Sequence, residues 1–217
     1  MTAGRIEVLI ESTPKKAFAS ALDWPGWSRS GKTPEAALAS LLAYVPRYAP
    51  VAKLAGLALP DDPRLEVVAT REGDASTEFG VPSVIATRDR TRLTTAEARR
   101  RADLVAAAWR SFERVAAAAP AELRKGPRGG GRDTARIIEH VVASDHGYTR
   151  ELGIKLPAPD PTERASVGAL HEAMLAVLRR PSDGSPIAKR WTTAYAARRI
   201  AWHALDHAWE IEDRTPA

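Results

Sequence analysis

Two short segments near the start of the chain alternate apolar and polar side chains. In residues 5–11, RIEVLIE, apolar residues recur at every second position, and residues 16–22, KAFASAL, follow a similar pattern after the turn-forming sequence STPKK. A period of two is typical of a strand with one buried face. The pattern therefore predicts an antiparallel strand pair, and RLEVVAT at 64–70 predicts a further short strand.

A helix is predicted between these strands, over residues 34–45. It follows a Pro-Gly turn in DWPGW, and Thr33 is suited to be its N-cap and Pro34 its first residue. Pro46 and Pro50 are expected to kink or restart this helix, because proline has no amide hydrogen to donate to the preceding turn.

The remaining pattern divides the chain into two parts. Residues 1–72 are predicted to form a small α+β module, and the weak pattern of residues 73–93 predicts a linker. Beyond it, apolar residues recur with the period of a helix, and Gly- and Pro-rich sequences interrupt them. Four helices are predicted, over 94–118, 133–152, 161–180 and 187–213. The predicted fold class is therefore α+β, a small N-terminal α+β module followed by a C-terminal four-helix bundle over 94–217.

Local sequence signals mark where three of these helices begin. TTAE at 94–97 has the form of a capping box. Asp133 or Thr134 is expected to cap the second helix, and Asp160 to cap the third, with Pro161 as its first residue.

Three of the five histidines occupy positions that suit metal binding. His203 and His207 are four residues apart, an offset that places both on one face of the last helix. His140, three residues after Ile137 on the second helix, is expected to point inward or nearly so. Three imidazoles can bind one divalent ion and leave a coordination position open, which is typical of catalytic rather than structural zinc sites.

The histidines also allow interpretations without a metal. His140 can instead hydrogen-bond across the helices to Asp206 or Glu210. His146 is expected at the rim, unless a shift of register exchanges its role with that of His140. His171 is expected to be a packed histidine at the edge of the core.

Composition narrows the classes of function. The 217 residues include no cysteine, so disulfides, iron–sulfur clusters and a protein thiol nucleophile are excluded, and any thiol chemistry must take its sulfur from outside the chain. The net charge of +5 comes mostly from arginine, yet aromatic residues make up only 6%, so nucleic-acid binding is not favoured. Because there is neither an apolar run of about 18 residues nor a signal peptide, a cytoplasmic location without membrane contact is expected.

The segments IIEHVVASDHGY and RRIAWHALDHAWE resemble the DinB superfamily of metal-binding four-helix bundles, over about residues 91–217. The resemblance implies that His140, His203 and His207 bind a divalent metal ion such as Zn, Ni or Fe. It also implies a small-thiol-dependent S-transferase, isomerase or hydrolase acting on a small-molecule substrate. Asp206 and Glu210, one turn from the ligands, are the expected catalytic groups, orienting an imidazole or moving a proton.

The identity of the small thiol is suggested by composition. A chain rich in alanine and arginine is typical of GC-rich actinobacterial genomes, in which the natural small thiol is mycothiol. Mycothiol is therefore the expected co-substrate, by analogy alone.

The N-terminal sequence KKAFASALDWPGWSRSGKTPEAALASL resembles HicB-like domains, over about residues 4–57. The resemblance implies an accessory or dimerisation module, so a homodimer is left open. Trp24 and Trp27 are expected to pack or, as the alternative, to recognise a partner, whereas Trp202 and Trp209 on the last helix are expected to be core anchors. The sequence thus leaves a second function open: a non-catalytic interaction protein whose N-terminal module binds a protein partner while the bundle serves as scaffold.

Overall fold

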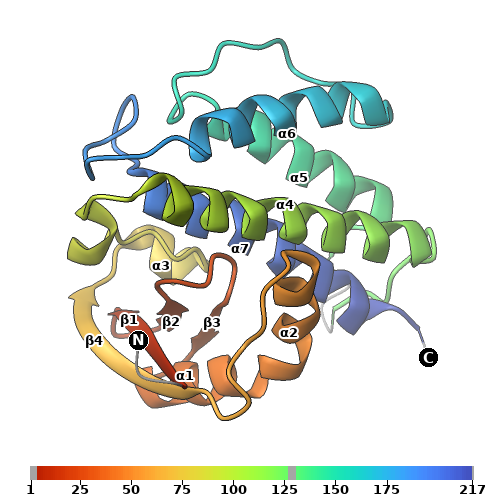
Figure 1. Cartoon of the computed structure of the whole chain (residues 1–217). Coiled ribbons are helices and arrows are strands. Elements are labelled where there is room, and N and C mark those ends of the chain that lie inside the picture. The colour runs from red at the N-terminus through yellow and green to blue at the C-terminus, as the bar shows by residue number, and fades with distance from the viewer. Residues whose placement is uncertain (1–3, 127–130, 217) are drawn as a thin grey trace.

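The computed structural model describes residues 4–126 and 131–216 of the chain. These ranges form a mixed α+β structure with one four-stranded sheet and seven α-helices (Figure 1). The strands are β1 (Arg5–Ser12), β2 (Ala17–Ala21), β3 (Ser28–Gly31) and β4 (Arg64–Glu72). The α+β class predicted from the sequence is confirmed.

The sheet has the strand order β3-β2-β1-β4. β1 pairs antiparallel with β2, as predicted, whereas β4 pairs with β1 in parallel. A parallel pair requires a crossover connection, which here includes helices α1 (Pro34–Ala43) and α2 (Val45–Leu54). The sequence pattern does not predict β3, because SRSG has no apolar alternation.

Helix α1 begins as its capping signals predict. The hydroxyl of Thr33 accepts a hydrogen bond from the amide of Ala36, and Pro34 is the first residue of the helix. The chain then restarts as α2, with Pro46 in the first turn, where a missing amide hydrogen costs nothing. The restart predicted at Pro46 is confirmed.

The segment between the sheet and the long helices is anchored to the sheet. It contains the short helix α3 (Ala75–Phe79) and the 3-10 helix η1 (Thr87–Arg90). The buried carboxylate of Glu11 on β1 accepts hydrogen bonds from the Thr77 hydroxyl and from the amides of Ser83 and Val84. The predicted linker is thus held in place by a buried acid that the sequence pattern does not single out.

The remaining helices are α4 (Thr95–Ala118), α5 (Thr134–Tyr148), α6 (Arg164–Leu178) and α7 (Thr193–Arg214). The capping box of α4 is confirmed. By contrast, α5 ends four residues before the predicted Leu152, and α6 begins at Arg164 because Asp160 accepts from Thr162 within a turn instead of capping the helix. Within the described ranges, no helix has both the length and the apolar character that crossing a bilayer requires.

Helices α4 and α7 run side by side through the middle of the molecule (Figure 1). The sheet, α1 and α2 lie on one side of this pair, and α5 and α6 lie on the other. One continuous cluster of buried apolar side chains includes Ile10 of β1, Leu41 of α1, Tyr48 of α2, Leu104 of α4 and Leu205 of α7. The core therefore extends across the predicted boundary between the two parts of the chain.

The turn at residues 24–27 packs the N-terminal part against α7. Trp27 is buried, stacks on Tyr48 with 5.3 Å between ring centroids, and donates its indole hydrogen to the carbonyl of Leu41. Gly26 has φ of +92°, and a Cβ there would lie 2.6 Å from Cδ1 of Leu205. The prediction that Trp24 and Trp27 pack is confirmed, since both side chains are buried.

Candidate metal centre

Helices α5 and α7 bring His140, His203 and His207 together. The two α7 histidines share a helix face, as their spacing predicts, and their ring centroids are 4.7 Å apart. His140 reaches across from α5, with its centroid 5.1 Å from that of His203 and 4.9 Å from that of His207. The convergence of three imidazoles that the sequence predicts is therefore present.

The nitrogen positions fit a single ion. Nε2 of His140 lies 3.2 Å from Nε2 of His203, and one ligand atom from each of the three histidines lies within 4.8 Å of the others. Two nitrogens bound at 2.0–2.1 Å to a tetrahedral ion lie about 3.3 Å apart. The Nε2 atoms of His140 and His203 already have this separation, and the ligand atom of His207 lies within 4.8 Å of both.

Glu210 orients His207. Its Oε2 lies 2.7 Å from Nδ1 of His207, and its Oε1 accepts from Nη1 of Arg214 at 2.7 Å. With Nδ1 used in this way, Nε2 is the nitrogen that His207 presents to the cluster. A carboxylate bound to the distal nitrogen of a metal-ligating histidine is a common arrangement, because it fixes the tautomer and the ring orientation.

Asp206 faces the sheet. Its Oδ1 accepts from Nη1 of Arg29 on β3 at 2.8 Å, and Arg29 lies 4.0 Å over the ring of Tyr44. Burial raises the pKa of Asp206, and the charge of Arg29 opposes that shift. Within the described part of the chain, Asp206 makes no hydrogen bond to the histidines, so its position suits holding β3 against α7.

The hydrogen bonds that the metal-free alternative requires are not formed among the described residues. His140 approaches His203, whereas Glu210 is bonded to His207. A hydrogen bond between the two Nε2 atoms is itself compatible with their 3.2 Å separation if one ring carries the hydrogen there. The contact that His140 makes across the helices is thus to His203, and not to Asp206 or Glu210 as the metal-free alternative predicts.

The environment favours the neutral form of two of these imidazoles, those of His203 and His140. Burial, followed by the positive potential of His207 and Arg199, holds the pKa of His203 well below its usual value. Burial also lowers the pKa of His140, and the potential of His207 and Arg132 adds to the effect. Neutral rings have free lone pairs, which is the form that binds a metal ion.

The other two histidines lie outside the cluster. Nε2 of His146 is 2.9 Å from the carbonyl of Leu156, so no shift of register exchanges it with His140. His171 lies at the core edge, as expected, and stacks on Trp109 with 3.7 Å between centroids. Its Nε2 lies 3.1 Å from Oδ2 of Asp145, a fully buried acid that also accepts from Nε1 of Trp109.

Asp145 is a buried acid with specific partners that the sequence pattern does not identify. Burial raises its pKa, and hydrogen bonding to His171 opposes the shift. The only sequence signal is an acidic residue four positions after Val141, on the apolar face of the helix. Burial of an acid on such a face indicates a specific partner, but the sequence does not say which.

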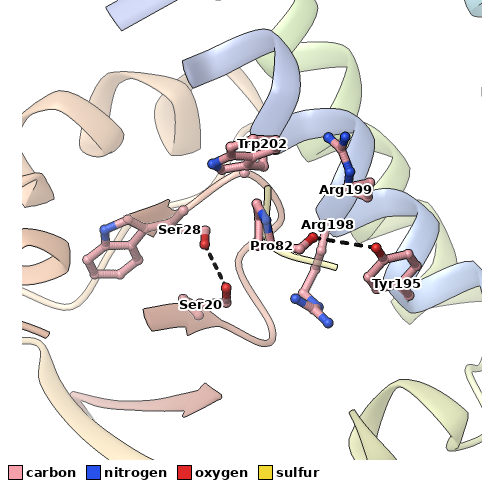
Figure 2. Close-up of a pocket in the computed structure, with 10 residues that line it drawn as sticks. Ser20, Ser28, Pro82, Tyr195, Arg198, Arg199 and Trp202 are labelled. Atoms are coloured by element: carbon pink, nitrogen blue, oxygen red, sulfur yellow. Dashed lines mark hydrogen bonds between the residues drawn. The ribbon is translucent and has the colours of Figure 1, made fainter. Parts of the chain in front are cut away.

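Little space lies between α7 and the sheet around Tyr195 and Trp202. A cavity of about 10 Å³ lies there between Ser20, Ser28, Pro82 and Tyr195, and Figure 2 shows Trp202 of α7 beside it. This volume is at the limit for one water molecule, so no substrate fits. His203 is buried while His140 and His207 are partly exposed, so access to the cluster comes from their side.

Comparisons with protein-family models, with curated proteins and with solved structures found no match to this chain. The resemblances to the DinB superfamily and to HicB-like domains therefore stay predictions that rest on the motifs.

Proposed function

We propose that the protein is a metal-dependent enzyme of the DinB type, in which α4 to α7 form the four-helix bundle and His140, His203 and His207 hold one divalent ion such as Zn, Ni or Fe. The observation that carries this proposal is the convergence of three imidazoles from two helices, with two Nε2 atoms 3.2 Å apart. Three protein nitrogens leave one coordination position for a reactant.

A bound divalent ion supplies one kind of chemistry here: it lowers the pKa of a thiol or water at its open position. The chain has no cysteine, so the thiol is external, and mycothiol is the proposed co-substrate. The reaction classes that fit are S-transfer, isomerisation and hydrolysis of a small molecule.

The chain's own groups have distinct proposed roles. Glu210 holds His207 in the tautomer that presents Nε2, and Arg214 holds Glu210. Arg132 and Arg199, whose charges act on His203, favour an anion such as a thiolate beside the cluster. Asp206 is proposed to act through its contact with Arg29, by positioning α7.

The alternative function, a non-catalytic interaction protein, has less support than the metal-dependent enzyme. It assigns partner recognition to Trp24 and Trp27, and both side chains are buried within this chain. Trp27 is occupied by Tyr48 and by the carbonyl of Leu41. We therefore propose that the HicB-like module supports the bundle through their shared core.

Cobalt(II) provides the test, because the visible bands of tetrahedral cobalt report on both the ligands and the open position. Titration of metal-free protein is expected to saturate at about one cobalt per chain, and adding a small thiol is expected to produce a sulfur-to-cobalt charge-transfer band. His140→Ala and His207→Ala should lose the spectrum, whereas His146→Ala should keep it.

Two results count against the proposal. One is a folded wild-type protein that gives no cobalt spectrum. The other is a spectrum that is equally strong in His140→Ala, His207→Ala and His146→Ala. A cobalt site that does not respond to thiol would retain the metal centre and remove the thiol chemistry.

A further inference from the structure

A groove lies on the α6 side of α5, between α4, α5 and α6, away from the histidine cluster that α5 and α7 form. Its volume is about 670 Å³, within the range of about 300–1,000 Å³ that is typical of small-molecule sites. Its apolar lining comes from all three helices and includes Phe112 of α4, Val141 and Val142 of α5 and Val167 of α6. Such a lining suits a ligand with an apolar body.

The groove is rigid at one end. His171 lines it, and the ring of His171 is fixed by stacking on Trp109 and by the bond from Nε2 to Asp145. Asp145 is fully buried, and its Oδ1 has no hydrogen-bond partner among the described residues. Because the stacking on Trp109 and the bond to Asp145 hold His171 in place, this wall cannot collapse into the groove. The space is therefore preformed.

The groove also carries a positive charge that no contact within the described ranges uses. Arg114 of α4 and Arg164 of α6 both line it, both are exposed, and neither forms an ion pair there. Arg110 is directed elsewhere, since its Nη2 donates to the carbonyl of Leu54. Glu113 is the acidic residue of the lining, so two available cations face one carboxylate.

We propose that this groove binds a small amphipathic monoanion, an aromatic or acyl acid whose apolar body lies on the valine and phenylalanine side chains while its acidic group pairs with Arg114 and Arg164. The groove complements such a ligand in two ways: its apolar side chains suit the apolar body, and its two arginines suit the acidic group. A charge-assisted hydrogen bond to arginine contributes more than a neutral one, so the acid group provides specificity. The site is independent of the proposed metal centre.

A matched pair of fluorescent probes tests both kinds of complementarity. 1-Anilinonaphthalene-8-sulfonate has an anionic group, and N-phenyl-1-naphthylamine has the same rings without it. Full-length protein is expected to bind the sulfonate at about one site per chain and roughly tenfold or more tightly than the neutral amine, as one charge-assisted hydrogen bond predicts.

Two sets of variants test the positive charge of the groove and its apolar space separately. The double variant Arg114→Gln/Arg164→Gln should bind the sulfonate no better than the amine, whereas Arg99→Gln, an exposed arginine of α4 outside the groove, should behave as wild type. Ala116→Trp and, independently, Val167→Trp fill the groove from opposite helices and should abolish binding of both probes. Circular dichroism of each variant shows that it is folded.

Three results would overturn the proposal. They are equal affinity for the two probes, sulfonate binding that survives both tryptophan variants in folded protein, and a concentration-dependent dimer that the tryptophan variants dissociate. The last result would assign the groove to a second copy of the chain. Loss of cobalt binding in His140→Ala with unchanged probe binding would confirm that the two sites are separate.

Discussion

At the scale of single residues, Glu210 determines which nitrogen His207 offers. Replacing it by glutamine removes the negative charge beside Nδ1 and leaves a weaker, neutral acceptor, while the shape is kept. Glu210→Gln is expected to weaken zinc binding about 10- to 100-fold, the usual cost of losing such a partner. Competition with a chromophoric chelator measures the affinity. The matched control is Glu212→Gln, because Glu212 lies on the same helix as Glu210 but pairs with Arg47 of α2. Equal affinities in the two variants would contradict the role of Glu210.

Tyr195 gives a prediction for alkaline pH. Burial raises its pKa from 10.0 to about 12, and its hydroxyl lies 3.4 Å from the carbonyl of Pro82. Between these two pH values the unfolded state loses a proton that the folded state retains, so the free energy of unfolding falls as pH rises, by roughly 2–3 kcal/mol for this group. Urea unfolding of wild type and Tyr195→Phe at several pH values measures the difference.

Tyr195→Phe has no hydroxyl to titrate, so its free energy of unfolding should not show this decrease with pH. The stability advantage of the wild type over Tyr195→Phe, measured at pH 8, should therefore shrink or reverse by pH 12. A difference that stays constant with pH would mean that Tyr195 titrates alike in both states.

Residue chemistry was predictable where it depends on local spacing. The offset of four between His203 and His207 places both on one face of any helix, and His140 follows from the apolar pattern around it. The pairings of Asp206 with Arg29 and of Asp145 with His171 join residues far apart in the sequence. No local pattern specifies such contacts, because they depend on how the elements pack.

At the scale of elements, the turn at Gly26 sets how closely the N-terminal part approaches α7. Gly26→Ala is expected to destabilise the protein by more than 1 kcal/mol, roughly, because φ of +92° is strained for alanine and its Cβ would lie 2.6 Å from Leu205. Gly168→Ala is the control: Gly168 lies inside α6 with nothing within 4 Å of an added Cβ. That variant should gain about 0.5–1 kcal/mol.

Denaturant unfolding of Gly26→Ala and Gly168→Ala measures the change in the free energy of unfolding for each variant. If Gly26→Ala is as stable as the wild type, the close approach of this turn to α7 is not what fixes the position of the N-terminal part.

The elements with strong local signals were predicted, and the others were not. Capping residues mark the starts of α1 and α4, and both helices begin where those residues indicate. β3 depends on its pairing with β2, and the start of α6 depends on a turn that uses the side chain of Asp160 in another way. Propensity gives way to tertiary context at these positions.

At the scale of the whole molecule, the continuous apolar core predicts cooperative unfolding. Side chains of β1, α1, α2, α4 and α7 belong to one buried cluster, so no boundary in it allows one part to melt first. Urea unfolding followed by tryptophan fluorescence and by far-ultraviolet circular dichroism should give coincident transitions. Two separated transitions would show that the N-terminal module and the long helices fold as independent domains.

The central claim is that three imidazoles from α5 and α7 form one metal site, and metal content tests it most directly. Metal-free full-length protein is equilibrated with zinc, dialysed and subjected to elemental analysis. We expect about one zinc per chain in the wild type and in His146→Ala, and almost none in His140→Ala or His207→Ala, with all four folded. Folded wild-type protein without zinc, or equal zinc content in all four proteins, would contradict the claim.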